Sequence, residues 1–163
     1  MQRQIKSIEA QQLAEVRAAK AAPDTAQREA AMLFILTRVV GIGVDTAQTL
    51  VREILSRQLR DRRALARYAG LTGAPDESGS KRREKGLARA GNAKVRKSMI
   101  QLAWRFTMFQ KESGLVQWFF ARTVAAGRLR KTMIVALARK LLIALWRAVT
   151  LGVLPEGVVL RAA

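Results

Sequence analysis

The amino-acid sequence predicts an all-α domain, and three observations favour this fold class. Apolar residues recur at spacings of three and four along most of the chain, as they do on the buried face of a helix. No stretch shows the sustained alternation of apolar and polar residues that is typical of a strand. Half of the 163 residues are hydrophobic, which is enough to form a core.

Residues 1–22 are predicted to form a coiled-coil-like helix. A thin apolar stripe runs along this otherwise polar segment: Ile5, Ile8, Leu13 and Val16. Because such a stripe needs a partner helix, we expect self-association into a dimer or tetramer. Pro23 interrupts the pattern, so we place a domain boundary there, with a helical domain over 23–163.

The first half of that domain is predicted to hold three helices. Asp24 can cap a helix through Met32, Leu33 and Ile35 that stops at Gly41. A second helix is expected over about 45–55, on the spacing of Ala47, Leu50, Val51 and Ile54. Asp61 then opens a short helix over 62–69.

The second half starts with a loop and continues with three more helices. Residues 70–91 lose all apolar periodicity in a stretch of glycines and cations, so we predict an exposed basic loop. Asn92 can cap a helix whose buried stripe is Val95, Met99, Leu102, Ala103 and Phe106. Helices are expected over about 115–126 and 129–150, the last ended by Gly152 and Pro155.

Charge and composition limit the functions that are open to the chain. Thirty Lys and Arg face twelve Asp and Glu, a formal net charge of +18, which favours a polyanionic partner. Histidine and cysteine are absent, which excludes disulfides, zinc fingers and triads with an imidazole base. We find no apolar run long enough to span a bilayer and no signal peptide, and we expect a cytoplasmic protein without a membrane partner.

Three elements are candidates for binding nucleic acid, and the first is the stretch from Phe34 to Ala47. Gly41 and Gly43 make a GxG turn of the kind that joins the helices of a helix-hairpin-helix, followed by Thr46. Such a turn can bring backbone N–H groups close to a phosphate. Val40 stands where the motif usually has proline, and an ordinary tight turn is the alternative.

The second element is the loop around Ser78. A serine beside Gly79 and ringed by cations has the surroundings that a hydroxyl nucleophile needs for phosphoryl transfer. The candidate nucleic-acid-binding residues here are Gly79, Ser80, Lys81, Arg82, Arg83, Lys85, Arg89, Asn92 and Arg96. Since no histidine is available as a base, composition alone favours a phosphate-binding loop without catalysis.

The third element is the cationic covering of the carboxy-terminal helices. Between Trp104 and Leu151 the single acid Glu112 faces the following cations: Arg105, Lys111, Arg122, Arg128, Arg130, Lys131, Arg139, Lys140 and Arg147. This imbalance favours polyanion binding over a merely solvated face. The aromatic residues of the same region are predicted to lie in the core: Trp104, Trp118, Phe119, Phe120 and Trp146.

Together these residues resemble the carboxy-terminal domain of the IS-one-ten family of insertion-sequence transposases, which includes IS-one-sixteen and IS-nine-oh-two relatives. The matching pieces lie between Leu36 and Trp146, and they keep a family-like order and spacing. They are the GIG turn with Thr46-Ala47, the string Leu65 to Leu71, Ser78-Gly79, Gly86, Ala90-Gly91-Asn92 with Arg96, and Val135 to Leu142.

The resemblance implies an RNA-guided serine recombinase that moves an insertion sequence, with DNA and a structured guide RNA as partners. Ser78 falls on the family's serine, which is expected to attack a DNA phosphate, and Ser80 remains an alternative. In this family a RuvC-like domain with four acidic metal ligands precedes a coiled coil and this domain. This chain supplies no such ligands, so it resembles a fragment or truncated product, inactive alone, and Mg²⁺ is expected only through the RuvC-like domain.

Two interpretations without catalysis stay open. The chain could be a helix-hairpin-helix protein that only binds DNA or RNA, with Ser78 as a simple loop residue. It could also be a ribosome-associated or membrane-surface basic protein, which we favour less because no single helix is both cationic and strongly amphipathic.

Overall fold

The computed structural model of the chain describes residues 25–72, 91–126 and 130–162. Every regular element in these ranges is helical, which confirms the predicted all-α class. One isolated antiparallel bridge, between Val39 and Leu160, joins two non-helical stretches. The predicted coiled-coil-like helix over 1–22 and residues 73–90 of the predicted basic loop lie outside the described residues.

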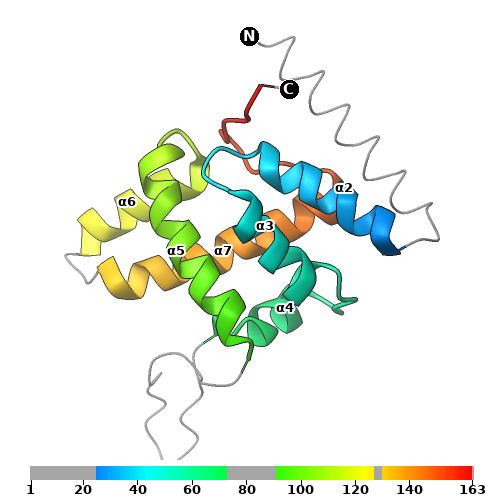
Figure 1. Ribbon diagram of the computed structural model, residues 1–163. Helices are drawn as coiled ribbons and strands as arrows, with labels where there is room; N and C mark the ends of the chain where they lie inside the picture. Colours follow the sequence, from blue (N-terminus) through cyan, green and yellow to red (C-terminus); the bar gives the residue numbers. More distant parts are fainter. Residues whose placement is uncertain (1–24, 73–90, 127–129, 163) are drawn as a thin grey trace, which may run out of the picture.

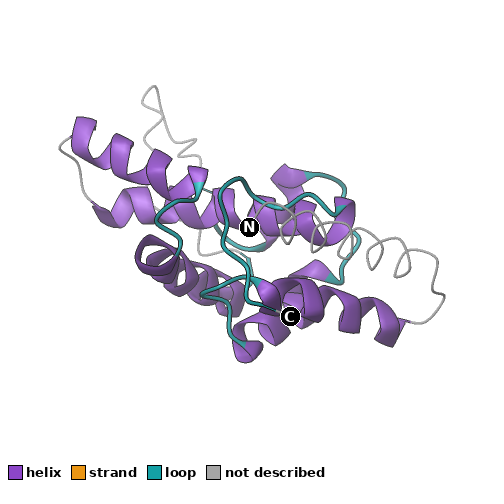
Figure 2. Ribbon diagram, turned by 90° about the horizontal axis from the view of Figure 1, so that it is seen from above, coloured by secondary structure: helices purple, strands orange, loops and turns teal. Residues whose placement is uncertain are grey.

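The longest helix, α7 (Arg130–Leu151), is the centre of the fold. It contacts α2 (Thr25–Arg38), α4 (Arg62–Tyr68), α5 (Ala93–Phe109) and α6 (Gly114–Ala126). Figure 1 shows α5 crossing α7, with α3 (Val44–Leu50) between α5 and α2, and Figure 2 shows the same helices from above. The buried side chains of α7 recur at helical spacing and include Leu137, Leu141 and Leu145, so one face of this helix supplies much of the core.

Helix α5 is the second main contributor to the core, and it forms as predicted. The side chain of Asn92 accepts hydrogen bonds from the N–H groups of Lys94 (3.0 Å) and Val95 (3.2 Å), which caps the helix. The five predicted apolar positions, from Val95 to Phe106, are all buried. The four larger side chains, all except Ala103, each contribute about 1.5–3 kcal/mol of burial free energy.

The predicted second helix is interrupted. Helix α3 passes directly into η1, a π-helical turn over Val51–Leu55, in which the N–H of Ser56 donates to the carbonyl of Val51 at 3.1 Å. Val51, Ile54 and Leu55 of this turn are buried, so the apolar pattern predicted burial correctly and only the backbone type was wrong.

The short helix α4 begins at Asp61, as predicted. The N–H of Ala64 donates to the Asp61 carboxylate at 2.9 Å, and this hydrogen bond holds the pKa of the carboxyl below its ordinary value. Leu65, Ala66 and Ala69 lie on the face that packs into the core. The other faces of α4 are left to solvent.

Candidate nucleic-acid interface

The predicted GxG turn joins α2 to α3. Gly41 has a φ of +100°, a left-handed conformation that favours glycine, and it lies against the side chains of Phe106 and Phe109 of α5. Ile42 is fully buried and anchors the turn in the core. Gly43 is the residue before α3 and has a φ of −83°, so only the first of the two glycines needs its conformational freedom.

Thr46 of the first turn of α3 is tied to α5. Arg105 donates from Nη2 to the Thr46 hydroxyl at 2.9 Å, while its Nε is buried without a hydrogen-bond partner among the described residues. The contact places a guanidinium beside the start of α3, where backbone N–H groups are free of helical partners. The sequence indicated Arg105 only as one of many surface cations.

A carboxy-terminal strap, which we define as residues 155–162, closes over the turn. The N–H of Val40 donates to the carbonyl of Val159 at 3.1 Å. Arg161 donates from Nη1 to the carbonyls of Thr37 and Ile42, the latter at 2.8 Å. The strap therefore fixes both the end of α2 and the middle of the turn.

Gln110 joins the strap to the turn from the end of α5. It is 1% exposed, donates from Nε2 to the carbonyls of Val40 (2.7 Å) and Val159 (2.9 Å), and accepts from the N–H of Val159 (2.8 Å). One side chain thus satisfies three backbone groups from two segments that are far apart in sequence.

The two ends of the undescribed segment 73–90 are held together. Gly70 has a φ of +69° and Gly91 a φ of +103°. A Cβ on Gly91 would lie 2.6 Å from the Gly70 nitrogen and 2.9 Å from the Arg67 carbonyl oxygen, so the two backbones meet at van der Waals distance. We call this contact between Gly70 and Gly91 the glycine crossing, and at the position of Gly91 only glycine fits it.

Asn92 ties the crossing to the rest of the fold. Besides capping α5, it donates from Nδ2 to Glu53 Oε2 at 2.8 Å, and its own N–H donates to the Tyr68 carbonyl at 2.7 Å. Lys94 Nζ lies 3.8 Å from Glu53 Oε1. The residue predicted as a nucleic-acid contact is therefore a structural anchor for the ends of the serine-bearing segment.

The predicted site residues do not form one cluster. Gly41, Gly43 and Thr46 gather near the carboxyl end of α5, whereas Asn92 and Arg96 lie at its amino end. Thirteen helical residues from Asn92 to Arg105 correspond to about 20 Å of separation. Figure 1 shows the turn between α2 and α3 at the opposite end of α5 from the crossing. Several predicted residues lie outside the described part of the chain: Ser78, Gly79, Ser80, Lys81, Arg82, Arg83, Lys85 and Arg89.

Beside the crossing lies a group of cations that the sequence-based predictions missed. Arg60, Arg62, Arg63 and Arg67 are all exposed and belong to α4 or to the turn that leads into it. The short helix was predicted correctly, so its charged face could have been found from the same residues. Arg57, just before them, lies over the ring of Tyr68 at 4.8 Å from its centroid.

The predicted cationic covering of the carboxy-terminal helices is present in the described residues. Lys111, Arg122, Lys131, Lys140 and Arg147 are exposed, and Arg139 is half-buried. Lys140 Nζ lies 4.6 Å from the centroid of the Trp118 ring, so some of this charge packs on an aromatic face. Arg128 and the side chain of Arg130 lie outside the described residues.

The prediction that the aromatic residues form core is wrong for two of the five. Phe119 is buried, and Trp118 and Trp146 are partly buried, but Trp104 is 38% exposed and Phe120 is 45% exposed. The buried Phe119 ring makes edge-to-face contacts with the rings of both Trp104 and Phe120. Met108 is exposed as well, so the described residues keep several large apolar side chains at the surface.

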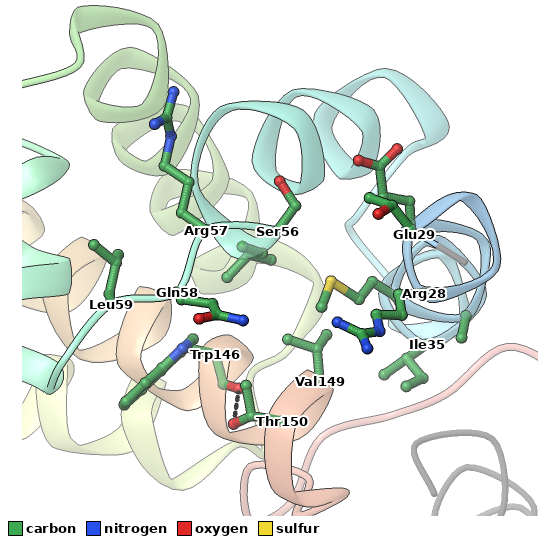
Figure 3. A pocket seen from close by; sticks show the side chains of 14 residues that line it. Arg28, Glu29, Ile35, Ser56, Arg57, Gln58, Leu59, Trp146, Val149 and Thr150 are labelled. Atoms are coloured by element: carbon green, nitrogen blue, oxygen red, sulfur yellow. Dashed lines mark hydrogen bonds between the residues drawn. The ribbon is translucent and has the colours of Figure 1, made fainter. Parts of the chain in front are cut away.

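A groove of about 540 Å³ opens between α2, the end of η1 and α7 (Figure 3). Its floor is apolar and includes Met32, Ile35, Trp146 and Val149. Figure 3 shows that Arg57, although it borders the groove, extends away from its centre. No group of three metal-ligating side chains exists among the described residues, here or elsewhere.

The described residues thus define a basic helical domain with two cationic regions. None of its described helices has the length and apolarity that crossing a membrane requires. A model of the transposase IS116/IS110/IS902 family matches residues 34–117, a range that includes the GxG turn, Ser78 and Asn92. The chain belongs to this family of transposases.

A curated relative supports the same family. The chain is 42% identical over 164 residues to a protein of Sinorhizobium fredii (strain NBRC 101917 / NGR234) that bears the name "Putative transposase y4rJ". The alignment covers 97% of this chain and 41% of the relative. The chain therefore spans well under half the length of the curated relative that it matches.

Proposed function

We propose that this chain acts in DNA transposition, as the DNA-binding and nucleophile-bearing domain of an insertion-sequence transposase. The observation that carries the proposal is the family match over 34–117, since it includes both the GxG turn and the serine segment. The excess of Lys and Arg, with a net charge of +18, supports a nucleic-acid substrate.

In this proposal Ser78 is the nucleophile. Its hydroxyl oxygen attacks a DNA phosphorus, the bond from phosphorus to one DNA oxygen breaks, and the proton passes to the released DNA hydroxyl. The covalent phosphoserine keeps the energy of the broken phosphodiester bond until a second DNA end attacks it. The cations that follow in sequence, from Lys81 to Arg89, are suited to stabilising the extra negative charge of the pentavalent phosphate.

Partners and cofactors follow from the family. A structured guide RNA would pair with target and donor DNA, and the GxG turn with Thr46 and Arg105 would hold a phosphate without reading its sequence. Mg²⁺ would be bound by the RuvC-like domain of the family. The described residues of this chain offer no cluster of acids for it, so we assign this chain no step that runs through the metal.

The test uses a chimera in which this chain replaces the matching region of the Sinorhizobium relative. Wild type, Ser78→Ala and Ser80→Ala are compared in a recombination assay with element DNA, target DNA and guide RNA. We expect Ser78→Ala alone to abolish strand exchange and the covalent protein–DNA adduct while DNA binding remains. Normal recombination by both variants would contradict the nucleophile assignment.

The second candidate is a helix-hairpin-helix protein that binds DNA or RNA without catalysis. The left-handed Gly41 and the strap that fixes the turn favour it, because both preserve a turn that can approach a phosphate. This function predicts that duplex binding depends on the turn and that no adduct forms with any serine variant.

A further inference from the structure

Helix α4 and the turn that leads into it carry exposed arginines. Arg63 and Arg67 are four residues apart in α4, which places them on one face, and Arg60 lies in the turn before the helix. The opposite face, with Leu65, Ala66 and Ala69, is buried. We call Arg60, Arg63 and Arg67 the arginine row. All three are exposed.

The arginine row is poorly neutralised. Asp61 is the acid nearest in sequence, and its carboxylate is used to cap α4 by accepting from the N–H of Ala64. Arg60 and Arg67 both act on the Asp61 carboxyl electrostatically, but neither they nor Arg63 form a salt bridge with any described residue. One shared carboxylate against three guanidinium groups leaves a net positive surface.

The arginine row is rigidly placed beside the glycine crossing. The N–H of Leu71 donates to the Ala66 carbonyl at 3.0 Å, and that of Asn92 donates to the Tyr68 carbonyl. The Arg67 carbonyl itself touches Gly91. The arginine row is thus attached to the same part of the fold, the end of α4 and the start of α5, that holds the two ends of the segment carrying Ser78.

We propose that the arginine row is a docking surface for the phosphate backbone of duplex DNA. The inference rests on the proposed function and assigns the residues that hold the DNA beside the serine segment. From Arg63 to Arg67 the helix rises about 6 Å, and Arg60 lies in the turn before it. A DNA strand presents one phosphate for about every 3.4 Å of duplex axis, so Arg63 and Arg67 can reach two consecutive phosphates and Arg60 supplies a third guanidinium.

The guanidinium groups of the arginine row suit the phosphate backbone of DNA better than the edges of its bases. Guanidinium groups bind phosphate oxygens through two parallel hydrogen bonds, and three of them close together in sequence suit a series of phosphate charges. All three side chains are exposed, where they can meet the phosphate oxygens of a DNA backbone. The contact should therefore be independent of DNA sequence.

The experiment measures binding of the full 163-residue chain to a duplex DNA of random sequence at several salt concentrations. The test variant is R60Q/R63Q/R67Q. The matched control is R28Q/R52Q/K97Q, which removes three other exposed cations, from α2, η1 and α5. Circular dichroism and thermal melting verify that both variants fold, as expected for exposed side chains.

We expect the arginine-row variant to lower the slope of log K against log salt by about 2.7, at about 0.9 for each neutralised phosphate. At 0.1 M salt, binding should weaken roughly eightfold for each phosphate that is no longer neutralised. The control should change the slope by less than about 0.9. An equal loss in both variants, or a loss confined to duplex RNA, would overturn the proposal.

The arginine row and the proposed function can fail separately. If the arginine-row variant binds DNA normally while Ser78→Ala abolishes the adduct, the arginine row is not a DNA-docking surface and the proposed function stands. If the row variant loses DNA and Ser78→Ala still forms the adduct, the docking surface stands and the nucleophile assignment fails.

Discussion

At the scale of single residues, Gly70, Gly91 and Asn92 hold the start of α5 against the end of α4. Gly91 lets the chain cross Gly70, and Asn92 directly after it caps α5 and binds Glu53. The family-like string Ala90-Gly91-Asn92 therefore has a structural explanation in this chain. It needs no contact with nucleic acid to explain why glycine and asparagine stand there.

Substituting Gly91 by alanine should destabilise the domain. The new Cβ would meet the Gly70 backbone and the Arg67 carbonyl at distances that real Cβ atoms do not adopt, at a φ of +103°. We expect a loss of about 1–3 kcal/mol in the free energy of unfolding, measured by urea denaturation.

Gly43→Ala is the control for Gly91→Ala. A Cβ on Gly43 would meet no other atom within 4 Å, and the φ of Gly43 is not positive, so its substitution should cost about 0.5 kcal/mol. Equal stability of both variants would mean that the crossing relaxes without cost.

At the scale of elements, the strap over the GxG turn is the feature with the clearest energetic weight. Gln110 satisfies backbone groups of Val40 and Val159 from a buried position at the end of α5. Removing it leaves the Val40 carbonyl and the Val159 N–H without this partner, while the Val159 carbonyl keeps the hydrogen bond from the Val40 N–H.

Gln110→Ala should therefore lower the free energy of unfolding by about 2–4 kcal/mol, from the removal of three hydrogen bonds at about 1 kcal/mol each. Gln101→Ala, on an exposed position of the same helix, should change it by less than about 0.5 kcal/mol. Thermal or urea denaturation of the two variants checks the difference. A small effect of Gln110→Ala would show that water replaces these hydrogen bonds.

Local signals predicted the helices well, and long-range contacts explain what they missed. The cap and apolar stripe of α5 were predictable because Asn92, Val95 and Met99 lie within a few residues of each other. The strap was not predictable, because Arg161 reaches a carbonyl 119 residues earlier in the chain. The groove of Figure 3 was missed for the same reason, since its lining comes from three distant segments.

The candidate site was predicted less completely than the fold. Sequence reasoning joined the GxG turn and Asn92 into one string of family motifs, but α5 holds them about 20 Å apart. The order of motifs along the chain does not show which of them lie close together in the folded domain. The arginine row was overlooked because arginines are common throughout this chain. The burial of the opposite face of α4 is what shows that these arginines lie together on the surface.

At the scale of the whole molecule, the two proposed phosphate contacts lie at opposite ends of α5, which suits a partner as long as a nucleic-acid duplex. The turn with Arg105 lies at one end and the arginine row lies at the other. A small anion could occupy only one of them. A duplex of two helical turns is long enough to reach both.

The stripe of residues 1–22 leads to a prediction about assembly. We expect that removing these residues lowers the oligomeric state, because Ile5, Ile8 and Leu13 would be buried against another copy of the chain. Light scattering measures the mass.

The matched variants replace either Ile5, Ile8 and Leu13 or Gln11, Ala14 and Ala18 by serine. Only the first set should lower the mass, since Gln11, Ala14 and Ala18 lie on the side of the predicted helix away from the apolar stripe. An unchanged mass after deletion of 1–22 would contradict self-association through this segment.

The contact between Gly70 and Gly91 has a consequence for how such proteins can diverge. Because the chain leaves the helical frame and returns to it at one point, the length of the intervening stretch hardly affects the frame. Doubling its length would cost only about 0.6 kcal/mol in closure entropy. Related proteins could therefore exchange, shorten or extend this stretch as a cassette, and acquire new chemistry there while the helices beneath keep their packing.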